Sequence, residues 1–134
     1  MQPDYERADR WSPQVIGAAI EVHRDKEPGL LESIYHRCLL HELTLRGAPV
    51  ERELSVPITY KDLVFEAQIR LDLLVDRCLV VEIKAVEKLL PIHLAQTLSY
   101  MRLLHAPLGL VINFHEPVVK DGIRRLTLRG ADQP

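Results

Sequence analysis

Charged side chains interrupt an apolar run between Arg70 and Ala85, and this segment constrains the fold more than any other part of the chain. Residues 78–85 are rich in Leu, Val and Ile, which is typical of a buried strand, yet they include Glu82 and Lys84. Side chains two positions apart in a strand share one face, so both charges point the same way. Burying them is costly unless they are paired or bound to a metal. A lone Glu-x-Lys is most often a structural ion pair.

A second carboxylate, Asp72, lies ten residues before Glu82 and is also embedded in aliphatic residues. If the two segments form a hairpin, the turn length decides where Asp72 points, because a shift of one residue moves a side chain to the other face. A two-residue turn at 76–77 places Asp72 opposite Val81, with the carboxylates on opposite faces. A three-residue turn at 76–78 places Asp72 directly across from Glu82. Two adjacent buried carboxylates repel unless a proton or a divalent cation lies between them, and oxygen ligands suit Mg²⁺ or Mn²⁺.

The rest of the chain predicts helices before and after a set of strands. Ser12-Pro13 is typical of a helix N-cap and first helical position, and apolar residues at helical spacing continue to about Arg24. The expected elements are helices at 12–24, 30–46 and 92–105 and strands at 50–60, 64–75, 78–85, 108–114 and 123–128. The order α-α-β-β-β-α-β-β favours a mixed α/β fold, in which helices flank both faces of a central mixed β-sheet.

Length and composition narrow the class of protein. With 134 residues the chain is expected to form a single domain, 1–134, that is frayed at 1–11 and 130–134. Seventeen basic and nineteen acidic residues give a net charge of −2, so a nucleic-acid partner would need a local patch or a metal. Two cysteines exclude a disulfide framework and a four-cysteine zinc site. The chain shows no bilayer-spanning apolar run and no signal peptide, which predicts a cytoplasmic protein without a membrane partner.

Five ordered blocks of the sequence resemble one known family. Asp72 with Glu82-Ile83-Lys84 resembles the D…ExK core of the PD-(D/E)XK nuclease superfamily. Residues 29–35 (GLLESIY) resemble the signature of the GxxExxY protein family, a branch of that superfamily. The blocks lie at 29–35, 71–75, 81–85, 93–100 and 108–114. The resemblance covers roughly residues 13–128 and implies a restriction-endonuclease-like core at about 28–115.

The resemblance implies a site for Mg²⁺ or Mn²⁺. In the superfamily the aspartate, the glutamate and the main-chain carbonyl after the glutamate ligate the metal, which corresponds here to Asp72, Glu82 and the carbonyl of Ile83. The lysine, Lys84, is assigned to orienting or deprotonating the attacking water and to stabilising the charge that develops on phosphate. Phosphodiester cleavage needs a hydroxide-like nucleophile and neutralisation of negative charge, and a metal with an ammonium group supplies both.

Four further residues are supporting candidates, each with a structural alternative. The resemblance implies that Glu32, on the second helix, completes the metal shell; otherwise it is a surface acid. Tyr35 lies three residues on, shares the side of Glu32, and either supports the site or packs in the core. Gln96 and Tyr100 are spaced i and i+4 on the third helix and resemble the QxxxY element of the superfamily. They would orient ligands or phosphate; otherwise they are a polar stripe with a core tyrosine.

These features predict a metal-dependent nuclease that hydrolyses phosphodiester bonds in DNA or RNA, with Asp72, Glu82, Lys84 and Glu32 as catalytic residues. The alternative is a catalytically weak or inactive nucleic-acid-binding or regulatory module that keeps the fold. A third possibility is a structural protein whose acidic cluster is a relic. The charges kept within the strand favour the enzyme over the relic, because they are costly. The near-neutral net charge favours the binding module, or an enzyme that works as a homodimer or with a protein partner.

Overall fold

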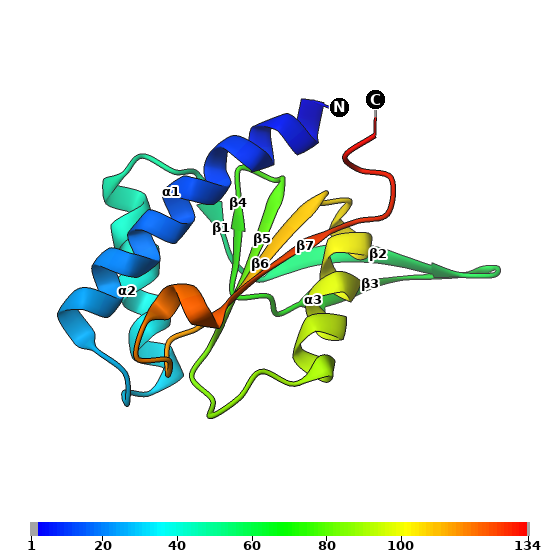
Figure 1. Ribbon diagram of the computed structural model, residues 1–134. Coiled ribbons are helices and arrows are strands. Elements are labelled where there is room, and N and C mark those ends of the chain that lie inside the picture. The colour runs from blue at the N-terminus through cyan, green and yellow to red at the C-terminus, as the bar shows by residue number, and fades with distance from the viewer. Residues whose placement is uncertain (1–2, 134) are drawn as a thin grey trace.

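The computed structural model describes residues 3–133 and centres on a five-stranded sheet (Figure 1). The strand order is β1-β4-β5-β6-β7. The bounds are β1 (Val50–Glu51), β4 (Leu73–Val75), β5 (Leu79–Lys84), β6 (Leu108–Asn113) and β7 (Ile123–Thr127). β5 and β6 run parallel, whereas the other neighbouring strands are antiparallel. The prediction of a mixed α/β fold with a mixed central sheet is confirmed.

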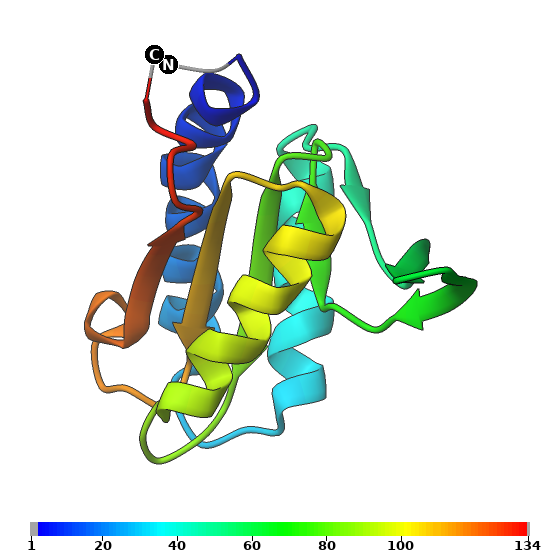
Figure 2. The ribbon, with the colours of Figure 1, turned by 90° about the vertical axis from the view of Figure 1, so that its right-hand side faces the viewer.

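Helices cover both faces of this sheet (Figures 1 and 2). α1 (Pro3–Lys26) and α2 (Glu32–Leu45) pack on one face, and α3 (Pro91–Leu104) packs on the other. Alternation along β5 sends Val81 and Ile83 into the core under α1 and α2, and Val80 into the core under α3. All of β6 is buried, which explains why residues 108–112 are continuously apolar. A short 3₁₀ helix, η1 (Val119–Gly122), leads into β7.

A hairpin that we call the arm leaves the main sheet between β1 and β4 and projects from the molecule (Figures 1 and 2). It consists of β2 (Leu54–Tyr60) and β3 (Leu63–Ile69), paired antiparallel. The expected strands 50–60 and 64–75 are therefore wrong as continuous strands, since each is divided between two sheets. The first break coincides with Glu53, whose φ of 48° is a left-handed value outside the strand region. The second break covers residues 70–72.

The base of the arm is buried against the main sheet, whereas side chains near its turn are exposed. Val56 and Ile69, at the base, are buried in the core on the α3 side of the main sheet. Tyr60 and Phe65, nearer the turn, are exposed. The two connections at the base, residues 52–53 and 70–72, are therefore held in fixed positions beside β4.

The first helix starts earlier than the sequence indicates. Residues 1–11 were expected to be frayed before an N-cap at Ser12, but α1 begins at Pro3 and carries Pro13 in its interior. Ala8 is fully buried, so tertiary packing overrides the local start signal of Ser12-Pro13. At the other end, residues 130–133 form turns rather than a helix or strand. None of the helices within residues 3–133 combines the length and apolar character that crossing a membrane requires.

Candidate active site

The hairpin of β4 and β5 brings the two motif carboxylates together. Val75 pairs with Leu79, so the turn spans residues 76–78, and continuing the register places Asp72 across from Glu82. Of the two alternatives from the sequence, the three-residue turn is the observed one. The Asp72 main-chain N–H donates to Glu82 Oε2 at 3.4 Å. The Ile83 N–H donates to Asp72 Oδ2 at 2.7 Å, which fixes that carboxylate against the end of β5.

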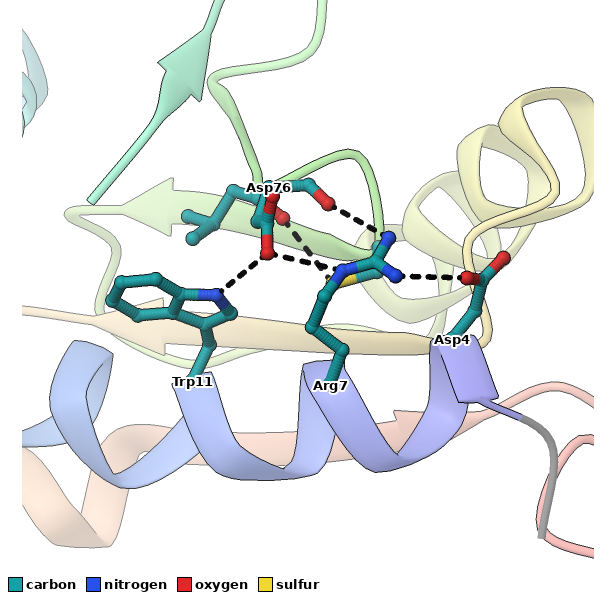
Figure 3. Close-up of polar contacts among 6 residues, drawn as sticks. Asp4, Arg7, Trp11 and Asp76 are labelled. Atoms are coloured by element: carbon teal, nitrogen blue, oxygen red, sulfur yellow. Dashed lines mark hydrogen bonds and ion pairs between the residues drawn. The ribbon is translucent and has the colours of Figure 1, made fainter.

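The turn that sets this register is held by α1 (Figure 3). Asp76 and Arg77 both have positive φ, 48° and 56°, and the Cys78 N–H donates to the Val75 carbonyl. Arg7 Nε forms an ion pair with Asp76 Oδ2 at 3.0 Å, and Trp11 Nε1 donates to the same oxygen at 3.0 Å. Arg7 also donates to the Asp76 main-chain carbonyl.

Lys84 shares the α3 face of the sheet with Glu82. The side chains of Val81 and Ile83 face α1 and α2, so alternation sends Glu82 and Lys84 to the opposite side. Lys84 is half-buried, and its positive charge lowers the pKa of Glu82, opposing the effect of burial. Within residues 3–133, Lys84 makes no ion pair or side-chain hydrogen bond, so its ammonium remains available to a ligand.

Glu82 combines a buried oxygen that has no hydrogen-bond partner among residues 3–133 with a strongly raised pKa. Its side chain is only 4% exposed, and Oε1 is the one buried side-chain polar atom in the described part of the chain without a hydrogen-bond partner. Burial raises the pKa of Glu82 to about 9, and the adjacent Asp72 carboxylate contributes in the same direction. A buried carboxyl of this kind needs a proton or a cation.

The oxygen donors here fit a divalent metal. Asp72 and Glu82 supply hard carboxylate oxygens, and the unpartnered Oε1 leaves one of them free. N–H and C=O of one residue in a strand point to the same edge, so the Ile83 carbonyl faces the edge at which its N–H meets Asp72. Mg²⁺ and Mn²⁺ bind through such oxygen sets and keep several waters.

Glu32 is not brought into this set. It is the first residue of α2, which packs on the face of the sheet opposite to Glu82, and its side chain is exposed. No group of three or more His, Cys, Asp and Glu residues within 3–133 could hold a metal ion. One turn further along α2, His36 Nε2 donates to the Asp72 main-chain carbonyl at 3.2 Å, so α2 supports the backbone of Asp72 without adding a carboxylate.

Tyr35 packs in the core, the second of the alternatives posed by the sequence. Its side chain is fully buried and stacks on Phe114 with ring centroids 4.6 Å apart. Its hydroxyl accepts a hydrogen bond from the Leu30 N–H at 3.1 Å and donates to the Glu27 carbonyl. Gly29 lies between them with φ of 111°, a conformation that glycine adopts readily. The Gly and Tyr of the 29–35 signature thus shape the loop that sets where α2 begins.

Gln96 and Tyr100 lie on α3, the helix that covers the Glu82 face. Gln96 Nε2 donates to the Tyr100 hydroxyl at 3.2 Å. Thr97 and Met101 are the buried residues of the helix, and they pack on Gly109 of β6, where a Cβ would meet the Met101 sulfur at 2.6 Å. Within the described residues, neither Gln96 nor Tyr100 hydrogen-bonds to the motif carboxylates. Their role in orienting ligands or phosphate therefore stays a prediction.

A cavity of about 280 Å³ borders Asp72 at the base of the arm. Its lining residues are His36, Arg52, Glu53, Arg70, Leu71 and Asp72. A larger groove, about 800 Å³, lies between α1 and α2 and does not touch the motif carboxylates. The small cavity is therefore the one that borders a motif carboxylate. Arg52 and Arg70 were not among the residues predicted from the sequence. Arg52 directly follows β1 and Arg70 directly follows β3, so they lie at the two breaks between strands.

The fold and the paired carboxylates define a restriction-endonuclease-like α/β domain. Residues 9–126 match the family model of the PD-(D/E)XK nuclease superfamily, so the chain belongs to this superfamily. The chain is also similar to the solved crystal structure of SSO0001, with a TM-score of 0.53 and 25% sequence identity. The similarity covers 90% of this chain and 60% of that one, so the chain spans about 60% of the length of SSO0001. No curated protein matches the chain.

Proposed function

We propose that this protein is a metal-dependent nuclease that hydrolyses phosphodiester bonds in DNA or RNA, and that it belongs to the GxxExxY branch of its superfamily. Asp72, Glu82 and the Ile83 carbonyl would hold Mg²⁺ or Mn²⁺. The observation that carries the proposal is the buried, unpartnered Oε1 of Glu82 beside the Asp72 carboxylate. A protein that binds no cation gains nothing from this arrangement, because a buried carboxyl lacking a partner costs stability.

In the proposed reaction, the cation and the surrounding side chains have separate roles. When bound, the cation supplies a water of lowered pKa and neutralises charge on the phosphate. The Lys84 ammonium, on the same face as Glu82, would orient the attacking water and stabilise the negative charge that develops on the phosphate oxygens. Asp72 is preorganised by the Ile83 N–H, so it needs no rearrangement to act as a ligand. Glu32 is left out of the proposed ligand set, because it is exposed on the helix behind the sheet.

A nucleic-acid-binding module without catalysis is the second candidate. The observation in its favour is that only two carboxylates of residues 3–133 converge on the site, since Glu32 does not join Asp72 and Glu82. Such a module would still bind a cation, but it would not turn over. Metal binding and cleavage therefore have to be measured separately.

Isothermal titration calorimetry with Mn²⁺ tests the metal site. We expect the unaltered protein to bind Mn²⁺, Asp72→Ala to lose that binding, and Asp121→Ala, which removes an exposed acid of η1, to keep it. Cleavage of a panel of single- and double-stranded DNA and RNA with Mg²⁺ or Mn²⁺ then tests catalysis. Lys84→Ala should bind Mn²⁺ normally and cleave nothing, because its ammonium acts on water and phosphate. Cleavage unchanged in Lys84→Ala would contradict the mechanism, and Mn²⁺ binding without cleavage of any substrate would favour the binding module.

A further inference from the structure

Two arginines at the base of the arm line the cavity that borders Asp72, and Arg52 also reaches the groove between α1 and α2. Arg52 lies in the connection from β1 to β2, and Arg70 lies in the connection from β3 to β4. They are 18 positions apart in the sequence, and the antiparallel arm brings their connections together. The left-handed backbone at Glu53 makes the sharp change of direction that puts Arg52 at this point.

Neither guanidinium has a counterion among residues 3–133. Arg52 and Arg70 form no ion pair and no side-chain hydrogen bond with these residues, although Glu53 also lines the cavity. Arg7, by contrast, is paired with Asp76 elsewhere in the molecule. The cavity therefore has two sets of unused, fork-shaped donors in its wall. Arginine donors of this kind match the oxygens of a phosphate group.

Among the side chains that line the cavity, the other hydrogen-bond donor already has a partner. His36 is engaged with the Asp72 carbonyl, and the Asp72 carboxylate is engaged with the Ile83 N–H. The donors left free are thus the two guanidinium groups. An anion held by them would lie beside Asp72, one of the two carboxylates that we propose as metal ligands.

We propose that Arg52 and Arg70 form a subsite for a backbone phosphate of the nucleic-acid strand, next to the phosphate that is cleaved. The inference rests on the proposed nuclease function, and it names the residues that bind and position the substrate. Because they come from the two connections of the arm, the strand would run along the base of the arm. Contacts of this kind go to the backbone, so they hold the strand without reading its sequence.

The test is binding of a fluorescent single-stranded oligonucleotide, measured by anisotropy with Ca²⁺ present so that cleavage is slow. The test variant is Arg52→Gln with Arg70→Gln. The matched control is Arg10→Gln with Arg129→Gln, which removes the same charge from two exposed arginines that have no ion pair within the described residues. We expect the test variant to bind at least about tenfold more weakly, since hydrogen bonds to charged groups contribute that much or more. The control should stay within about twofold, because surface charges that touch no phosphate contribute little.

Two further readouts separate this proposal from the nuclease proposal. The salt dependence of binding should become shallower by about 0.7 in log–log slope for each phosphate that the variant no longer neutralises. Calorimetric Mn²⁺ binding should be unchanged in the test variant, because neither arginine is a proposed ligand.

Equal effects of the two double variants, or no oligonucleotide binding by the unaltered protein, would overturn the subsite. If inorganic phosphate displaced the oligonucleotide at equal phosphate concentration, the cavity would be a site for free phosphate and the strand-binding proposal would be wrong. Failure of Mn²⁺ to bind while the arginine effect persists would instead overturn the metal proposal.

Discussion

Glu82 makes the stability of the metal-free protein depend on pH. Burial, and to a smaller extent Asp72, raise the pKa of its carboxyl in the folded chain to about 9, against 4.5 for an ordinary glutamate. A group whose folded pKa is raised binds its proton more tightly in the folded state. Stability is therefore highest below the ordinary pKa and falls as pH rises toward 9.

We expect Glu82→Gln to be more stable than the unaltered protein at pH 8 in EDTA, and to lose this advantage near pH 5. Between the two pKa values, the difference in free energy of unfolding should grow by up to about 1.4 kcal/mol per pH unit. Urea unfolding at both pH values measures it, with Asp121→Asn as the control for an exposed acid. A difference that does not change with pH would show that Glu82 titrates normally.

The pairing of Asp72 with Glu82 could be anticipated from the sequence, whereas other residues could not. Strand alternation leaves only two faces for Asp72, and the three-residue turn was the alternative that sends it to the face of Glu82. Whether Glu32 reaches the carboxylates depends on the face that α2 covers, which no local pattern encodes. Arg52 and Arg70 become neighbours only through the arm. Residues joined by long-range contacts were the ones missed.

At the scale of elements, the register of the β4–β5 hairpin determines whether a metal site exists. Inserting a glycine between Asp72 and Leu73 leaves the Leu73–Val81 pair in place and moves Asp72 one position along the strand, opposite Ile83, which separates the carboxylates. We expect the insertion to abolish Mn²⁺ binding in calorimetry while circular dichroism keeps a folded α/β spectrum. Arg77→Gly is the matched control: it leaves the register unchanged, suits the positive φ, and loses only the exposed ion pair with Glu51. Normal Mn²⁺ binding by the insertion variant would argue against this register as the basis of the site.

The strands of the buried sheet interior were the predictable elements, and the divided strands were not. β5 and β6 are buried on both faces, so their sequences signal strands directly. Residues 50–60 and 64–75 also have strand-like composition, but composition does not say which sheet a strand joins. The breaks occur at Glu53 and at residues 70–72, and neither contains the glycine or proline that usually marks a turn.

At the scale of the whole molecule, the first turns of α1 are linked to the motif hairpin. Arg7 and Trp11 both contact Asp76, the residue that begins the β4–β5 turn (Figure 3). Arg7→Ala should lower the free energy of unfolding by about 1–2 kcal/mol, since it removes a half-buried ion pair and a hydrogen bond to a carbonyl. Arg10→Ala, an exposed arginine on the same helix, should leave it nearly unchanged. Chemical unfolding measures both, and equal stability of the two variants would mean that the contact with Asp76 does not stabilise the fold.

The shortness of β1 bears on what kind of polymer the site can receive. β1 pairs with β4 only at Val50–Val75 and Glu51–Leu74, so the edge of the sheet beyond Leu74 is left unpaired on the side of Asp72. On the face above, α3 packs on Gly109 through Thr97 and Met101. In the proposed function, a strand would approach along the open edge of the sheet and pass the base of the arm sideways. Passage of this kind requires no free terminus, so a covalently closed circle of nucleic acid would be as acceptable to the proposed site as a linear fragment.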